Sequence, residues 1–326
     1  MSQELQQKWL RNRKSGLDRS FYSFAGRKKV NIIYLFALVM LSALWGSTFF
    51  WTKILLEDFH PISIVFFRCL FGILFLLPFL IKQRAFSRIK LSPSLVCISL
   101  LGATVPWTFM TVSVQYLETT LTGIINALTP IFGMLLSILV LKQRAKALDS
   151  LSIFLGFFGV AFIFILQNKS VQASEFLGIV ILLSATFSYS FTSILSSKYQ
   201  KQTSPYILAF TTLFTATIIC GILMMFIQPD SYVYLFDSSN FTVYLILGML
   251  SSGLGFVVFY YLVAYGGPVY ALFITYLMPI VTLLLGYFFL DESVTASMII
   301  GLVFIFISIG LMNYQKRRES VKSESA

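Results

Sequence analysis

The sequence is poor in the residues from which most enzyme active sites are built. Charged residues make up only 11% of its 326 positions, against about 25% in soluble globular proteins, and there are 13 acidic residues and one histidine. No long apolar segment holds a Ser beside a base, a pair of Asp residues or a His and Glu cluster at membrane depth. We therefore expect no catalytic residues, no metal site and no cofactor.

Cysteine is also scarce. Cys69, Cys97 and Cys220 all lie inside apolar segments, where a free cysteine behaves as a small hydrophobic residue, so no disulfide framework is expected. The single histidine, His60, stands beside Pro61 without a Cys or His companion at metal-ligand spacing. Its position is typical of a polar residue at the end of a helix.

Apolar residues are abundant and are gathered into long segments. They make up 57% of the chain, and the mean hydropathy is +0.84. Each segment is near the roughly 20 helical residues that cross a hydrocarbon core of about 30 Å. The sequence predicts an all-α polytopic membrane protein with ten transmembrane helices over residues 32–54, 61–81, 95–115, 122–141, 149–166, 176–196, 205–227, 241–264, 271–290 and 296–314.

The charges alternate between the gaps. Of the 24 Lys and Arg, 21 precede the first segment or follow the second, fourth, sixth and tenth, whereas the other gaps hold acidic residues such as Glu57 and Glu118. Positive gaps stay in the cytoplasm, which predicts a multi-pass protein of the cytoplasmic membrane with both termini cytoplasmic. This topology and attraction to the lipid bilayer account for the net charge of +11, so no nucleic-acid partner is expected.

The two halves of the chain resemble each other. An offset of 149 places Pro130 over Pro279 and Asn126 over Thr275, and an offset of 144 places Trp45 over Tyr189. We expect five-helix repeats over residues 32–167 and 168–315, between tails over 1–31 and 316–326. Because five is odd, the second repeat enters the membrane inverted, which is typical of alternating-access transporters.

The prolines indicate where a substrate would bind. Pro130 and Pro279 each lack the N–H that would bond to a carbonyl four residues earlier, at Asn126 and Thr275. Near the middle of the membrane such carbonyls must face protein, water or ligand. Pro106 repeats the pattern. The alternative is that all three prolines only kink helices for packing.

Ten side chains are candidates for substrate binding, and Pro106, Pro130 and Pro279 for gating or kinking. Small-residue helix packing is the alternative for the cluster Trp45-Gly46-Ser47-Thr48, and an interfacial position is the alternative for the tyrosines. The candidates are Trp45, Thr48, Arg68, Trp107, Asn126, Thr129, Tyr189, Tyr261, Thr275 and Tyr276.

Arg68 is the only formally charged side chain well inside a segment. It has three alternatives: to extend along the helix to the outer headgroups, to pair with Glu57, Asp58 or Glu118, or to bind an anionic group of a substrate.

These residues resemble a known family. The chain is similar to the drug/metabolite transporter superfamily, specifically its ten-helix EamA-type members, over about residues 32–315. The shared motifs are Trp45-Gly46-Ser47, Pro61 followed by Arg68, Pro130, and Pro279 leading to Leu290-Asp291-Glu292.

The resemblance implies two inverted repeats around a cavity lined by helices 1, 3, 4, 6, 8 and 9. It also implies that helices 5 and 10 are peripheral, where a homodimer would form. Family members carry amino acids, metabolites, nucleotide sugars or toxic compounds. One departure is Gln143, which stands where the family commonly has an acidic residue matching Glu292.

We expect a secondary transporter that moves a small polar or amphipathic organic metabolite, such as an amino acid, a nucleotide-type metabolite or a drug-like solute, across the membrane by alternating access. A lipid-translocating protein and a non-transporting membrane scaffold are the alternatives.

Overall fold

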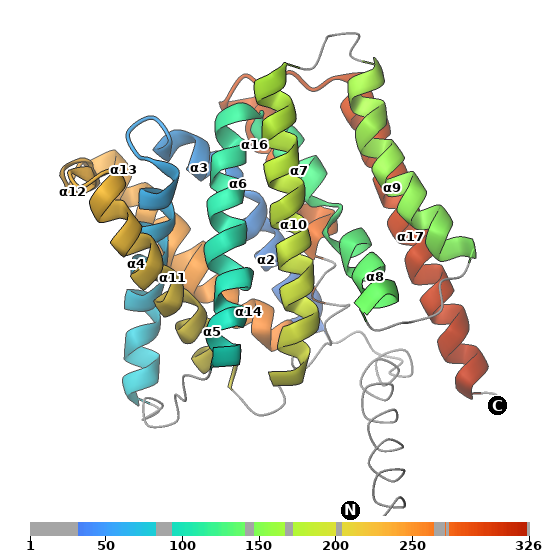
Figure 1. Cartoon of the computed structure of the whole chain (residues 1–326), viewed down its shortest axis with the longest axis horizontal. Coiled ribbons are helices and arrows are strands. Elements are labelled where there is room, and N and C mark those ends of the chain that lie inside the picture. Colours follow the sequence, from blue (N-terminus) through green and yellow to red (C-terminus); the bar gives the residue numbers. More distant parts are fainter. Residues whose placement is uncertain are drawn as a thin grey trace, which may run out of the picture.

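The computed structural model describes residues 32–82, 93–140, 147–166, 172–199, 204–263, 271 and 274–324. In these ranges the secondary structure is entirely helical (Figure 1). The predicted tail over 1–31 and Gln143 lie outside the described residues. The helices of the first half are α2 (Ile32–Gly46), α3 (Thr48–Leu55), α4 (Pro61–Lys82), α5 (Pro93–Ser99), η2 (Leu100–Thr104), α6 (Val105–Tyr116), α7 (Thr119–Asn126), α8 (Thr129–Val140) and α9 (Ala147–Leu166).

The second half begins with the long helix α10. Its helices are α10 (Ala173–Tyr199), α11 (Pro205–Ile227), α12 (Ser231–Leu235), α13 (Ser238–Tyr244), η3 (Leu245–Leu254), α14 (Gly255–Tyr261), α16 (Ile274–Phe289) and α17 (Ala296–Glu324). Pro61, Pro93 and Pro205 each occupy the first position of a helix, where a missing N–H costs nothing.

Seven stretches of the described residues are helical, long and apolar enough to cross a membrane, and three further apolar helices are shorter. The long ones are Ile33–Leu55, Pro61–Lys82, Leu95–Tyr116, Thr119–Leu136, Ala173–Thr192, Pro205–Ile227 and Ser239–Tyr261. The shorter ones are Ala147–Ile163, Ile274–Phe289 and Ala296–Leu311.

Two predicted helices are interrupted. The helix predicted over 122–141 is two helices, since α7 ends at Asn126 and α8 begins at Thr129. Pro130 therefore stands in the first turn of a new helix and does not kink a continuous one. The helix predicted over 32–54 changes from α2 to α3 at Ser47.

Two other helices widen into π-helical turns, η2 before Pro106 and η3 before Gly255. Periodicity did not predict either stretch, because a π-turn adds a residue without changing the apolar composition. At the C-terminal end, α17 continues through the polar residues after Tyr314 to Glu324, so most of the predicted tail is helical.

The helices pack around two large apolar cores and a smaller third one, which includes Phe59, Phe67 and Tyr244. One apolar core is formed mainly by α2, α4, α6, α11 and α14, and a second mainly by α7, α8, α9 and α17. The helix α10 contributes to both cores, through Tyr189 to the first and Leu182 to the second. In Figure 1, α9 and α17 lie side by side at one edge of the bundle. The helix α16 also contacts both, through Met278 in the first core and Tyr276 against the second. The two large cores therefore meet along α10 and α16 in the middle of the molecule.

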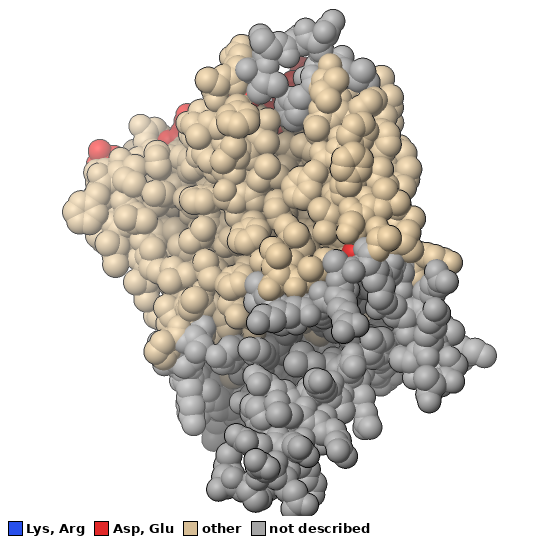
Figure 2. All heavy atoms as spheres, turned by 45° about the vertical axis from the view of Figure 1, so that its right-hand side comes forward, with Lys and Arg blue, Asp and Glu red and all other residues tan. Residues whose placement is uncertain are grey.

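The outer surface is apolar over the middle of the bundle. Figure 2 shows one face on which the described side chains are almost all uncharged, with acidic atoms mainly at its upper edge. Large apolar side chains such as Phe36, Phe154 and Phe226 are 69%, 63% and 82% exposed. A surface of this kind fits hydrocarbon, because in water it would form an aggregating patch.

Candidate functional site

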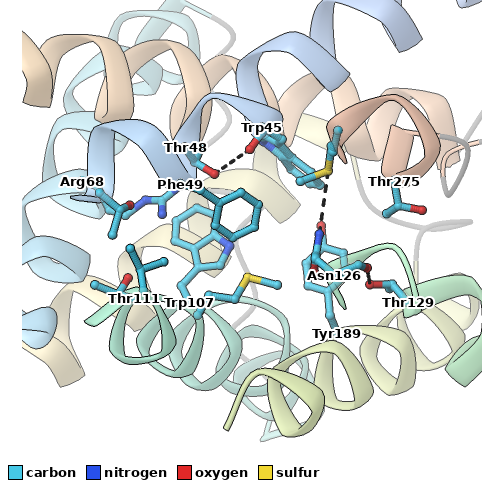
Figure 3. A pocket seen from close by; sticks show the side chains of 14 residues that line it. Trp45, Thr48, Phe49, Arg68, Trp107, Thr111, Asn126, Thr129, Tyr189 and Thr275 are labelled. Atoms are coloured by element: carbon cyan, nitrogen blue, oxygen red, sulfur yellow. Dashed lines mark hydrogen bonds between the residues drawn. The ribbon is translucent and has the colours of Figure 1, made fainter. Parts of the chain in front are cut away.

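A pocket lies in the middle of the molecule, where the two cores meet. Its empty volume is about 580 Å³, which includes space open to solvent. Figure 3 shows the lining side chains, which come from helices far apart in the sequence. They are Trp45, Thr48, Phe49, Thr52, Arg68, Trp107, Met110, Thr111, Val114, Asn126, Thr129, Tyr189, Thr275 and Met278.

Trp45 stands at the C-terminal end of α2, where the helix changes to α3. The Thr48 hydroxyl donates to the Trp45 carbonyl (2.6 Å), which satisfies the carbonyl at this interruption. The indole Nε1 donates to the Ser251 carbonyl in η3 (2.9 Å), and the ring meets Tyr189 edge-on at 5.9 Å. Next to it, Gly46 permits close approach to α16, since a Cβ there would lie 2.8 Å from Val281 Cβ.

Arg68 is 5% exposed on α4 and points into the pocket region. Its Nε donates to the Ser252 hydroxyl (3.1 Å), and its guanidinium carbon lies 3.8 Å from the centre of the Trp107 ring, a cation–π contact. Of the three alternatives, extension to the outer headgroups does not fit the structure, because the side chain is buried. Pairing with Asp58 does not fit it either, since that carboxylate instead accepts from Asn240 Nδ2 at 2.8 Å.

Ser252 is held in place by the π-helical geometry of η3. Its hydroxyl donates to the Leu247 carbonyl five residues earlier (2.8 Å), a spacing that a regular α-helix does not offer. The sequence analysis missed Ser251 and Ser252. The run Ser251-Ser252-Gly253-Leu254-Gly255 inside an apolar segment was the signal that could have identified them.

The break between α7 and α8 places Asn126 and Thr129 in the pocket lining. The Thr129 hydroxyl donates to the Asn126 carbonyl (2.6 Å), so this carbonyl is satisfied by protein, one of the three possibilities that the proline argument left open. The Ser190 hydroxyl on α10 donates to the Thr129 carbonyl (2.7 Å). The broken helix is thus fixed by hydroxyl donors on both sides of the break.

Two polar atoms of the lining are buried without a hydrogen-bond partner among the described residues. They are Asn126 Oδ1 and the Tyr189 hydroxyl, on side chains that are 3% and 8% exposed. The Asn126 amide nitrogen has only a weak contact, 4.0 Å from Met278 Sδ. A buried polar atom without a partner costs free energy, so such atoms are typical of a site that completes its hydrogen bonds with a ligand.

On the opposite side, α16 contributes Thr275 and Met278. Pro279 lies inside this helix and cannot donate to the Thr275 carbonyl, as the sequence predicts. The hydroxyl of Thr282 donates to the Met278 carbonyl (2.9 Å), so one more carbonyl near the proline is satisfied by a side chain.

The structure brings together eight of the ten predicted side chains and leaves two outside the lining. Tyr261 lies at the end of α14, with its ring 6.1 Å from that of Tyr34. Tyr276 packs on the second core, because it is about 100° around the helix from Thr275. Six residues were missed although each follows a predicted one by a helical spacing: Phe49, Thr52, Met110, Thr111, Val114 and Met278.

Outside the pocket, Glu292 joins the ends of α16 and α7. Its Oε1 accepts from the backbone N–H and hydroxyl of Thr119 (2.6 and 2.7 Å), and its Oε2 from those of Thr120 (2.8 and 2.7 Å). Asp291 takes a left-handed conformation (φ 52°) that turns the chain toward α7. At Gly286 any Cβ would collide with this carboxylate and with the Thr120 hydroxyl.

No group of three or more His, Cys, Asp or Glu in the described part of the chain is placed to hold a metal ion. The geometry thus defines a multi-pass helical membrane protein with an internal pocket of aromatic, hydroxyl and amide groups and one arginine.

Comparison with known proteins gives the family. The model of the EamA-like transporter family matches residues 32–165 and again residues 176–314, so the chain belongs to this family. It is 22% identical over 292 residues to the uncharacterized transporter YoaV of Bacillus subtilis, covering 88% of this chain and 99% of that protein.

Other relatives come from distant organisms. Protein PecM of Dickeya dadantii is 24% identical over 85% of this chain and 92% of its own length, and the WAT1-related protein At4g30420 of Arabidopsis thaliana is 26% identical over 79% and 78%. One crystal structure superposes with a TM-score of 0.63 at 13% identity, over 86% of this chain and 97% of the other. That likeness concerns the fold alone.

Proposed function

We propose that the protein is a secondary transporter that moves a small polar or amphipathic organic metabolite across the cytoplasmic membrane by alternating access. The observation that carries the proposal is the pair of unpartnered polar atoms, on Asn126 and Tyr189, in a pocket between two packing cores. In a membrane scaffold without a binding site, apolar side chains would be expected at these positions, because buried polar groups without hydrogen bonds destabilise the fold.

The helix pairings support two inverted five-helix repeats. α4 packs on η3, and its counterpart α11 packs on η2; α2 packs on α16, and its counterpart α10 packs on α8. Three further contacts join a helix to its own counterpart in the other half: α4 with α11, α7 with α16, and α9 with α17. Such pairings are expected of a two-fold axis in the membrane plane, the symmetry of many alternating-access transporters. The two family matches, over 32–165 and 176–314, agree with this arrangement.

The interruptions in the helices are placed where motion is required. The α7–α8 break and Pro279 lie in two helices that line the pocket, α7–α8 on one side and α16 on the other. We propose that these helices flex there while the cores rock about the pocket. The four hydrogen bonds of Glu292 hold α7 and α16 together at one end, the predicted outer end. The protein would therefore open there only after these bonds are broken.

The orientation with both termini in the cytoplasm belongs to the proposal, as does a homodimer formed through α9 and α17. The charge alternation supports the orientation. The peripheral place of the two helices in Figure 1 agrees with the homodimer.

The test begins with a thermal-shift screen of the detergent-purified protein against amino acids, nucleotides, nucleotide sugars, organic acids and cationic drugs. A ligand at 100 times its dissociation constant stabilises a protein by about 2.7 kcal/mol, which is easily measured. Uptake of each hit into proteoliposomes then decides the function. Uptake above that of protein-free vesicles is expected. Lipid scrambling without solute uptake would favour the lipid-translocating alternative, and neither activity would favour the scaffold.

A further inference from the structure

The charge of the pocket lining indicates a class of substrate. Among its lining residues Arg68 is the only one that carries a formal charge, and no carboxylate belongs to the lining. A guanidinium that is 5% exposed within a membrane-spanning segment is costly unless it is compensated. The contacts that it makes, with a hydroxyl and an aromatic ring, compensate it only in part.

Among the described residues, the guanidinium also has donors without a hydrogen-bond acceptor. It has five N–H groups, of which the Nε–H is directed to Ser252. The two terminal nitrogens carry the other four in a planar fork that matches the two oxygens of a carboxylate. Trp107 holds the guanidinium in position through the cation–π contact, and its own ring is held by Phe256, which stacks on the indole at 5.0 Å.

The other lining residues indicate which chemical groups the rest of the ligand would carry. Phe49 and Trp107 stand between Arg68 and Asn126 in Figure 3, and Trp45 and Met278 complete an apolar middle part. At the far end, Asn126 Oδ1 requires a donor, and the Tyr189 hydroxyl can both donate and accept.

We infer that the pocket binds organic monocarboxylates, with the carboxylate on Arg68, an apolar or aromatic body against Phe49 and Trp45, and a hydroxyl or amide group at Asn126 and Tyr189. This inference rests on the proposed function and names the substrate class of the same pocket. A monoanion is expected because one arginine neutralises one charge. A dianion or a cation would bring an uncompensated charge into an otherwise neutral pocket.

The experiment compares ligands of one shape and different charge. Binding of phenylacetate, phenylacetamide and phenethylamine to the detergent-purified protein is measured in sulfate buffer by calorimetry and thermal shift. We expect phenylacetate to bind about 10- to 100-fold more tightly than its amide, the range that corresponds to a charged hydrogen bond. 4-Hydroxyphenylacetate is expected to bind more tightly than phenylacetate, because its hydroxyl supplies the donor that Asn126 Oδ1 lacks.

Two arginine variants keep the test independent of folding. Arg68→Gln removes the charge and is expected to lose the preference for the acid over the amide, while its own thermal stability stays equal or rises, because a buried charge that is only partly compensated has been removed. Arg68→Lys keeps the charge and is expected to retain a weaker preference for the acid. Asn126→Ala is expected to keep this preference and to lose the gain from the 4-hydroxyl group.

Several results would overturn the inference. These are equal binding of the acid, the amide and the amine, an unchanged preference in Arg68→Gln, no binding by any carboxylate in an aliphatic and aromatic panel, or binding of chloride without selection for the organic body. The proposed function and this inference are tested by different results. Uptake of another solute class would leave transport standing without the anion inference, and anion binding without any uptake would leave the site standing without transport.

Discussion

At the scale of single residues, the pocket combines two kinds of side chain. Some have complete hydrogen bonds within the protein, and others have incomplete ones. Thr129 satisfies the Asn126 carbonyl and Ser252 anchors Arg68, whereas the Asn126 side-chain oxygen has no partner among the described residues. The first two contacts fix positions, and the last is available to a ligand. This difference separates residues that build the site from residues that we expect to bind substrate.

Asn126→Ala and Thr275→Ala test the binding role. We expect uptake into proteoliposomes to fall about 10-fold or more, as for the loss of a hydrogen bond of about 1.4 kcal/mol to substrate, while the thermal midpoint changes little. Thr211→Ala is the control, because Thr211 is 1% exposed on α11 and does not line the pocket. Unchanged uptake in both pocket variants would remove these residues from the site.

Trp45→Phe tests a positioning contact. The change keeps most of the ring but removes the Nε1–H that donates to the Ser251 carbonyl (2.9 Å). We expect the protein to lose about 1 kcal/mol of stability, since the buried carbonyl loses a donor. Thermal unfolding in detergent measures this, with Trp51→Phe at the partly buried Trp51 as the control. An equal effect of both changes would mean that the Ser251 contact contributes nothing specific.

At the scale of helices, the function depends on where regular geometry stops. The π-turns of η3 allow Ser252 to bond to the carbonyl five residues earlier and thereby to face Arg68. The α7–α8 break turns Asn126 into the lining, and the left-handed Asp291 directs Glu292 to the start of α7. Each irregularity uses local hydrogen bonds from side chains in place of the helical ones that it loses.

Glu292→Gln tests the contact between α16 and α7. One oxygen that accepts two hydrogen bonds becomes an NH₂ group facing donors, and the charge at a helix N-terminus disappears. We expect a loss of about 2 kcal/mol in stability, within the range for charged hydrogen bonds. Asp291→Asn is the matched control, because it removes a neighbouring exposed charge and Asn tolerates the left-handed conformation. The two variants should differ clearly in thermal midpoint. Equal midpoints would contradict the role of Glu292 in joining the end of α16 to the start of α7.

At the scale of the whole molecule, two large cores and a smaller third one share a bundle whose surface is suited to lipid. The pocket lies where the two large cores meet, so a change in the angle between them changes access to it. The charges outside the apolar segments then decide which side of the membrane each end of the bundle faces.

The orientation can be tested by labelling. In a chain whose three cysteines are replaced by serine or alanine, Glu57→Cys is expected to react with a membrane-impermeant maleimide on intact cells. Lys322→Cys is expected to react only after permeabilisation. Glu57 is exposed in the turn after α3. The opposite labelling pattern would reverse the proposed topology.

The sequence by itself determined the membrane character, the helix class and most candidate residues, because long apolar runs, prolines and isolated polar residues are local features that the chain carries wherever it folds. Trp45, Arg68, Trp107 and Asn126 could be selected in this way. Only the tertiary structure decided what each touches. It placed Arg68 over Trp107 in the protein interior, left Tyr276 outside the lining, and brought Ser251 and Ser252 of the π-helical stretch against Trp45 and Arg68. These outcomes depend on contacts between helices far apart in the chain, and the phase of a helix after a break or a π-turn is set by packing rather than by composition.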